Sequence, residues 1–108
     1  DLTAGQRAAL LAAIAAAGRP FGPEEEVELT LTRLDCRACH ERGGVGGPAP
    51  DRDAHFTGRD PGLGEQGRIP PSLTGVGAKL RDRWLRDVVV NGAGARPYLL
   101  TRMPRFGP

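Results

Sequence analysis

Apolar and polar residues follow a helical period at the start of the chain. Residues 3–17 begin with Thr3 and Gln6, which form a capping-box pattern, and continue as an alanine-rich segment with its large apolar residues on one face. Gly18 and Pro20 then supply the residue types that commonly end a helix. The pattern predicts a helix over residues 3–17.

The next segment fits two periods. Val27, Leu29 and Leu31 alternate as in a strand, whereas Leu34 completes a helical spacing with the first and last of them. A proline at the first position and three glutamates in the first turn favour a helix start. We therefore expect a helix over residues 24–40.

A long polar stretch rich in glycine and proline occupies residues 41–71 and shows no sustained period. A loop of this length in a compact domain is usually functional or supported by a cofactor. Its acidic residues lack the spacing of an EF-hand loop, so a solvated loop is expected here rather than a calcium site.

Two short helices are expected after this loop, over residues 73–80 and 82–91. The second combines an apolar stripe with oppositely charged i,i+4 pairs, and Gly92 ends it. Residues 93–108 are irregular, and no sheet is expected. The pattern predicts an all-α class, a single domain over residues 1–108 with few short helices and long irregular loops. The stripe consists of Leu80, Trp84, Leu85, Val88 and Val89.

Composition adds two constraints. The 108 residues include 16 glycines and 10 prolines but only 5% aromatic residues. A chain this small buries little surface, so something besides side chains is expected to help fill the core. No apolar run reaches the roughly 18 residues of a membrane-spanning helix, so no transmembrane segment is expected.

Charge is unevenly distributed. Residues 1–50 carry five arginines against seven acidic residues, whereas residues 51–108 carry ten basic against six acidic residues. The basic half lacks an aromatic stacking platform, which argues against nucleic acid as a partner. It is expected either to orient an acidic protein partner or to be an ordinary solvated surface.

The sequence CRACH at positions 36–40 carries the candidate chemistry. The C-x-x-C-H pattern is typical of the attachment site of a c-type haem. Cys36 and Cys39, one helical turn apart, suit the two vinyl groups along one haem edge, and His40 then directs its imidazole at the iron. A redox dithiol, a zinc site and a simple disulfide remain alternatives. A redox dithiol normally occurs in a βαβ context, which is missing here. A zinc site would need more ligands, and His55 is the one further Cys or His in the sequence.

Met103 is the only methionine and lies in an irregular segment between Arg102 and Pro104. A lone methionine is commonly core filler. A thioether on a rigid loop also suits a distal iron ligand, which is the interpretation favoured here. His55 is the competing candidate for that ligand, although a solvent-exposed loop histidine is the simpler interpretation.

Three motifs, in this order, resemble class I cytochrome c: CRACH at 36–40, PSLTGV at 71–76 and RMPRF at 102–106. A Trp-Leu pair, common in that family, lies on the helix between the last two. The final stretch also resembles cytochrome domains of planctomycete-type multidomain proteins.

The resemblance implies a cytochrome c-like fold around one covalent haem c. It implies thioether bonds from Cys36 and Cys39, with His40 as the proximal and Met103 as the distal iron ligand. It also implies that the Pro71 carbonyl accepts a hydrogen bond from Nδ1 of His40, which fixes the imidazole tautomer. The residues implied to line the haem pocket are Leu73, Trp84, Leu85, Val88 and Phe106. From residue type and position, we expect Arg96, Tyr98 or Trp84 to pair with the haem propionates.

Members of this family usually have a helix after the methionine loop, which this chain lacks. Residues 2–17 resemble that helix. We expect them to take its place from the other end of the chain, as in a circular permutation, and to pack against helix 24–40 near the haem. The alternative is a segment of tandem domains whose own last helix is not included.

The implied function is a one-electron relay, not an enzyme. Covalent haem attachment implies a periplasmic or otherwise extracytoplasmic location, and no signal peptide is visible in the chain. The expected partner is a redox protein, or a fused redox domain, with an acidic docking surface. Two alternatives remain: a haem-based ligand sensor or weak peroxidase with a displaceable Met103, and a module in which haem only stabilises the fold.

Overall fold

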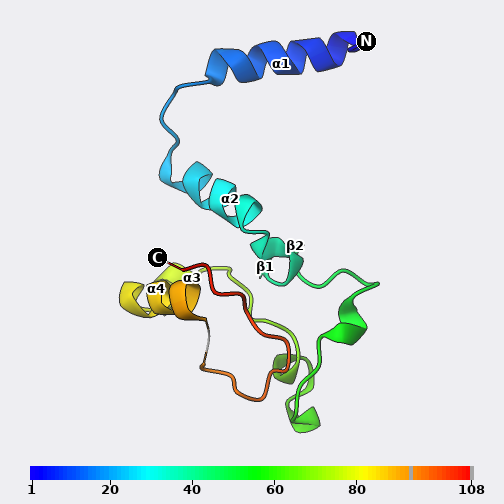
Figure 1. The fold of residues 1–108 in the computed structure, drawn as a ribbon, viewed down its shortest axis with the longest axis vertical. Coiled ribbons are helices and arrows are strands. Elements are labelled where there is room, and N and C mark those ends of the chain that lie inside the picture. The colour runs from blue at the N-terminus through cyan, green and yellow to red at the C-terminus, as the bar shows by residue number, and fades with distance from the viewer. Residues whose placement is uncertain (93, 108) are drawn as a thin grey trace. The chain divides into compact units, whose positions relative to one another are not determined.

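The computed structural model describes residues 1–92 and 94–107 (Figure 1). It is 48% helical and only 6% strand, with long irregular segments, which fits the all-α class expected. The chain divides into two compact units, Asp1–Thr30 and the remainder from Leu31 onward. In the described part of the chain, no helix combines the length and apolar character needed to cross a bilayer.

The first helix, α1 (Ala4–Ala16), agrees with the prediction at both ends. The Thr3 hydroxyl accepts the Gln6 backbone N–H at 3.2 Å, and the Gln6 side chain accepts the Thr3 N–H at 2.8 Å, so the capping box is formed. No residue of α1 is buried, and Leu11 and Ile14 are each 68% exposed. The packing expected of this helix near a haem therefore stays a prediction.

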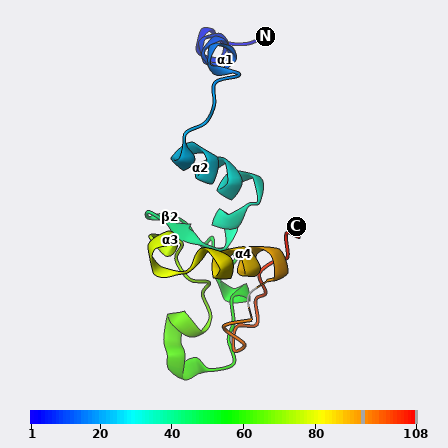
Figure 2. The same cartoon turned by 90° about the vertical axis from the view of Figure 1, so that its left-hand side faces the viewer.

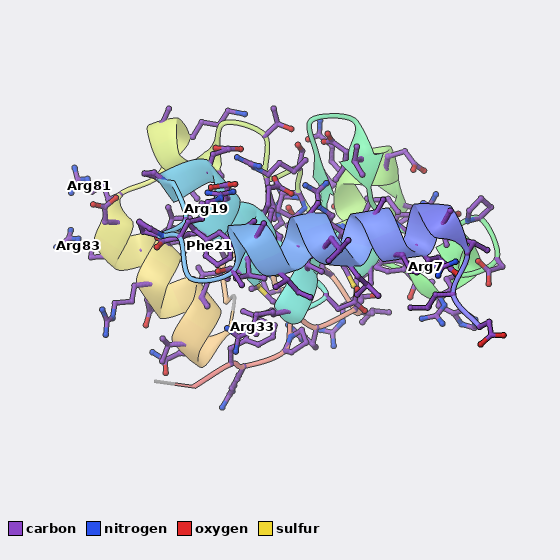
Figure 3. The ribbon with its side chains drawn as sticks, turned by 90° about the horizontal axis from the view of Figure 1, so that it is seen from above. Arg7, Arg19, Phe21, Arg33, Arg81 and Arg83 are labelled. Carbon is purple, nitrogen blue, oxygen red and sulfur yellow. The ribbon has the colours of Figure 1, made fainter. Side chains whose placement is uncertain are left out.

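Arg19 orders the chain before α2 (Pro23–Arg33). Its guanidinium donates two hydrogen bonds to the Glu25 carboxylate, one of them 2.8 Å long, and lies 5.8 Å from the centre of the Phe21 ring (Figure 3). The Gly22 backbone N–H donates to the same carboxylate at 2.9 Å. These hydrogen bonds, first from Arg19 and then from Gly22, lower the pKa of Glu25 to about 2.

The ion pair predicts how Glu25 titrates. We expect NMR of the full chain to place its midpoint near pH 2, and Arg19→Gln to raise it toward the ordinary value of 4.5. Because the folded pKa is depressed, the stabilisation is present above the unfolded pKa and is lost as the pH falls toward 2. Arg33→Gln, on the same helix, is the control and should leave the midpoint unchanged. An unshifted midpoint in Arg19→Gln would contradict the assignment.

The continuous helix expected over residues 24–40 is wrong. α2 ends at Arg33, and a separate 3-10 helix, η1 (Cys36–Ala38), follows it. Between them Asp35 has φ +50°, a left-handed conformation that cannot continue a right-handed helix. The motif therefore begins on its own turn, directly after this break.

The expectation of no sheet is also wrong, because the loop over 41–71 starts with a short antiparallel hairpin. Strand β1 (Glu41–Arg42) pairs with β2 (Val45–Gly46). The two residues between them, Gly43 and Gly44, have φ +60° and +80°. Positive φ at both central positions is what a two-residue hairpin turn of the primed type needs, and glycine meets it without strain.

Two 3-10 helices, η2 (Asp53–His55) and η3 (Pro61–Gly67), occupy the rest of this loop. The segment between these two helices is hydrogen-bonded to the C-terminal segment: the Thr57 carbonyl accepts the Leu100 N–H at 3.0 Å, and the Arg59 N–H donates to the Tyr98 carbonyl at 2.9 Å. Figures 1 and 2 show the two segments running side by side in both views. The long loop expected over 41–71 thus contains several short elements, and residues 57–59 are hydrogen-bonded to residues 98–100.

The last two helices differ in how well they agree with expectation. α4 (Asp82–Asn91) has the predicted bounds and ends at Gly92, which has φ +83°. α3 (Val76–Lys79) is shorter than the helix expected over 73–80, because Gly75 takes φ +65° and the helix begins only after it. The irregular segment expected over 93–108 is confirmed for residues 94–107, and Ala93 and Pro108 lie outside the described residues.

The side-chain core is very small. Among the described residues, the buried apolar side chains are Leu31, Phe56 and Leu99. The stripe on α4 is only partly covered, with Trp84 39% and Val89 38% exposed. The part of the chain from Leu31 thus leaves much of its apolar surface uncovered, as the composition predicts.

Candidate functional site

The motif forms a tight turn. Both the Cys39 and His40 backbone N–H groups donate to the Cys36 carbonyl, at 3.3 Å and 2.9 Å. Both cysteines are half-buried free thiols. Burial raises the pKa of each thiol, and for Cys39 the neighbouring Asp35 carboxylate raises it further. A raised thiol pKa is the opposite of the lowered pKa that activates a redox cysteine.

His40 is held by a residue far along the chain. Its Nδ1 lies 2.7 Å from the Pro71 carbonyl oxygen, the hydrogen bond expected from the sequence motifs. A carbonyl only accepts, so Nδ1 is the donor, and in the neutral imidazole this leaves the lone pair on Nε2. Backbone hydrogen bonds of this kind orient histidines that ligate metals.

The segment after Pro71 is anchored to the hairpin. The Leu73 N–H donates to the Glu41 carbonyl at 2.8 Å, and the Thr74 hydroxyl donates to the Glu41 carboxylate at 3.2 Å. Hydrogen bonds from the Ser72 side chain, and then from the Gly44 N–H, hold the pKa of Glu41 below its usual range. Because Glu41 directly follows His40, these contacts fix the distance between the imidazole and the Pro71 carbonyl.

Gly46 allows the hairpin to pass close to the motif. A Cβ on it would lie 2.7 Å from the His40 carbonyl oxygen and 2.9 Å from that of Arg37, and its φ is +89°. We expect Gly46→Ala to lower the free energy of unfolding by about 2 kcal/mol, through steric overlap and backbone strain together.

Gly43→Ala is the matched control, because Gly43 has φ +60° but nothing within 4 Å of an added Cβ. It carries only the strain of the positive φ. Denaturant unfolding of both variants measures the difference, and equal midpoints would show that the close approach at Gly46 contributes nothing.

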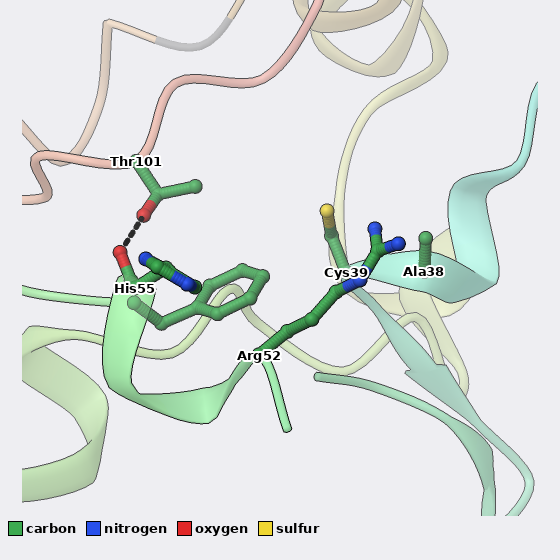
Figure 4. A pocket seen from close by; sticks show the side chains of 6 residues that line it. Ala38, Cys39, Arg52, His55 and Thr101 are labelled. Carbon is green, nitrogen blue, oxygen red and sulfur yellow. Dashed lines mark hydrogen bonds between the residues drawn. The ribbon is translucent and has the colours of Figure 1, made fainter. Parts of the chain in front are cut away.

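A pocket of about 400 Å³ opens beside the motif (Figure 4). Figure 4 shows the Arg52 side chain extending to Cys39, with His55 on the η2 side of the pocket. The Thr101 hydroxyl donates to the His55 carbonyl at 3.3 Å, which joins the two loop segments at the pocket wall. The lining residues are Ala38, Cys39, Arg52, His55, Phe56 and Thr101.

The expected site residues are only partly brought together. Cys36, Cys39 and His40 share one turn, and Pro71 contacts His40. Of these four residues only Cys39 lines the pocket, and Met103 and the expected haem-lining residues do not. Arg96 donates to the Gln66 carbonyl at 3.4 Å. Those that are half-buried elsewhere are Leu73, Leu85, Val88, Tyr98, Met103 and Phe106, whereas Trp84 is exposed.

Three lining residues were missed by the sequence analysis: Arg52, Phe56 and Thr101. Only Phe56 offered a signal, as an aromatic residue in an otherwise polar stretch, and it is 7% exposed. Arg52 and Thr101 resemble many other polar loop residues, and only the fold brings them to Cys39.

No group of three or more His, Cys, Asp or Glu side chains suited to a metal ion occurs within residues 1–92 and 94–107. Comparison of the chain with protein-family models, with curated proteins and with solved structures finds no match. The functional assignment therefore depends on the residues and their geometry.

Proposed function

We propose that this chain is an electron-transfer domain with one covalently bound haem c, of the class I cytochrome c type. The observation that carries the proposal is the 2.7 Å hydrogen bond from His40 to Pro71, made from within a CRACH turn. It leaves Nε2 of His40 available as a metal ligand. Cys36 and Cys39 would hold the haem, and His40 and Met103 would ligate its iron.

The contacts around Met103 support its role as distal ligand. Met103 is half-buried, and backbone hydrogen bonds restrain the chain on both sides of it. Before it, the Leu100 N–H donates to Thr57 at 3.0 Å, and after it, the Phe106 N–H donates to Val89 at 3.2 Å. A thioether on a segment restrained at both ends loses little freedom when it binds a metal.

The small number of buried apolar side chains is a further argument for a large apolar cofactor. Three buried apolar side chains are few for the part of the chain from Leu31, and several large apolar residues there are exposed. Covering them with a bound group would supply burial that the side chains do not supply for themselves. When bound, the haem supplies reversible one-electron exchange at its iron.

Basic side chains support a docking role toward an acidic redox partner or fused redox domain. Arg81 and Arg83, at the start of α4, are exposed and labelled in Figure 3. Exposed cations of this kind orient an acidic surface during encounter and act less strongly as salt screens them. Haem attachment through CRACH would imply a periplasmic or other extracytoplasmic location for the protein.

Absorption spectra of the protein, produced with a haem-attachment system, test the proposal. We expect haem that stays bound after denaturation, a c-type reduced spectrum, a weak long-wavelength sulfur-to-iron band when oxidised, and no response to carbon monoxide. Absence of covalent haem would overturn the proposal. Carbon monoxide binding by the untreated ferrous form would favour a ligand sensor or weak peroxidase instead.

A further inference from the structure

The pocket beside the motif is lined both by Cys39, a proposed haem-attachment residue, and by His55, the second histidine of the chain. Cys39 lines one part of its wall and His55 another. A group bonded to the Cys39 sulfur therefore borders the space that His55 also borders. Met103, the proposed distal ligand, is not among the residues that line this pocket.

The backbone of His55 is held from several directions. It ends η2, and its N–H donates to the Arg52 carbonyl at 2.9 Å. On one side, Nη1 of Arg68 donates to the Asp53 and Phe56 carbonyls at 3.2 Å and 3.3 Å. Phe56, the next residue, is buried. His55 is exposed, as the simpler interpretation expects, but it lies at the end of an ordered turn and lines the pocket.

The same turn is joined to the segment that carries Met103. The Thr101 hydroxyl donates to the His55 carbonyl, and Thr101 lies two residues before Met103. The chain contains two histidines and one methionine in all, so His55 is the only imidazole besides His40. If the thioether leaves the iron, His55 is thus the one remaining imidazole, and its turn borders the same pocket as Cys39.

We propose that His55 is an alternative distal ligand, which takes the iron when Met103 leaves it and so keeps the iron closed to small ligands. The proposal rests on the proposed function, since it needs a haem on Cys36 and Cys39. The exchange replaces a sulfur–iron bond by a nitrogen–iron bond and moves no electron. His/His ligation lowers the reduction potential relative to His/Met ligation.

The test compares haem-loaded Met103→Ala with the double variant Met103→Ala/His55→Leu. Leucine has no ligand atom but still fills the pocket, so it opens little new space for carbon monoxide. We expect a six-coordinate, low-spin spectrum from the single variant and a high-spin spectrum from the double variant. If His55 occupies the iron in nine of ten molecules of the single variant, its apparent carbon monoxide affinity is about tenfold weaker than that of the double variant.

A histidine placed elsewhere in the loop tests whether the position of His55 matters, or whether any nearby imidazole can bind the iron. Adding Arg59→His to the double variant returns a histidine to the same loop, on an exposed residue outside the pocket lining. We expect this triple variant to stay high-spin. Recovery of the low-spin spectrum would show that any nearby histidine suffices, and the pocket assignment would fail.

Other outcomes are equally decisive. A high-spin Met103→Ala protein that binds carbon monoxide freely would overturn the role of His55, as would a double variant that remains low-spin. If Met103→Ala does not accumulate, wild type and His55→Leu are compared in guanidinium, at the point where the sulfur-to-iron band disappears. Only wild type should then stay low-spin. Haem retained on denatured wild type tests the proposed function separately from this inference.

Discussion

Replacing Cys36 and Cys39 together with alanine is expected to leave the protein without bound haem after denaturation and without a cooperative unfolding transition in the part from Leu31. The physical reason is the core. The buried apolar side chains described there are Leu31, Phe56 and Leu99, too few to offset the conformational entropy lost on folding. Calorimetry and circular dichroism of the variant, beside the haem-loaded protein, measure the effect.

The control for this prediction is the unaltered chain produced without a haem-attachment system. It keeps both thiols, so any difference between it and the double variant reports the thiols alone. We expect the two to behave alike, because the missing stabilisation comes from the haem. A haem-free protein that unfolds cooperatively at the midpoint of the loaded one would show that the side chains suffice.

The second large effect is expected at Gly58, which bridges to Leu99 where the long loop meets the C-terminal segment. A Cβ on Gly58 would overlap the Gly67 carbonyl oxygen and lie 2.8 Å from its carbonyl carbon. Both atoms are backbone and cannot rotate aside. We expect Gly58→Ala to cost about 3 kcal/mol or more in the free energy of unfolding, the range of severe overpacking.

Gly77→Ala is the matched control for that substitution. Gly77 lies within α3, and an added Cβ would meet nothing within 4 Å. Alanine there should be neutral or stabilising by up to about 1 kcal/mol, because it is the better helix former. Denaturant unfolding of the haem-loaded variants measures both. Equal midpoints would mean that the contact between Gly58 and Gly67 relaxes without cost.

Helices could be predicted where the capping residues and the hydrophobic period of the sequence indicate the same bounds. α1 starts at its Thr3 capping box, and α4 starts and ends where its amphipathic pattern does. The break before the motif was not predictable in the same way. Asp35 is one of the residue types that tolerate φ above zero, but nothing in its neighbours requires that conformation. The Gly43–Gly44 pair did carry a hairpin signal, which the very short flanking strands concealed.

By itself, the sequence determined the helical class and the ends of two helices, because caps and hydrophobic periods act over a few residues. It also determined the CRACH motif, and the resemblance to a known pattern of motifs supplied its expected partner Pro71. The tertiary structure alone placed His55 and Thr101 beside Cys39. Those residues are brought together by hydrogen bonds between segments as far apart as 46 residues, and no local preference specifies which loops meet.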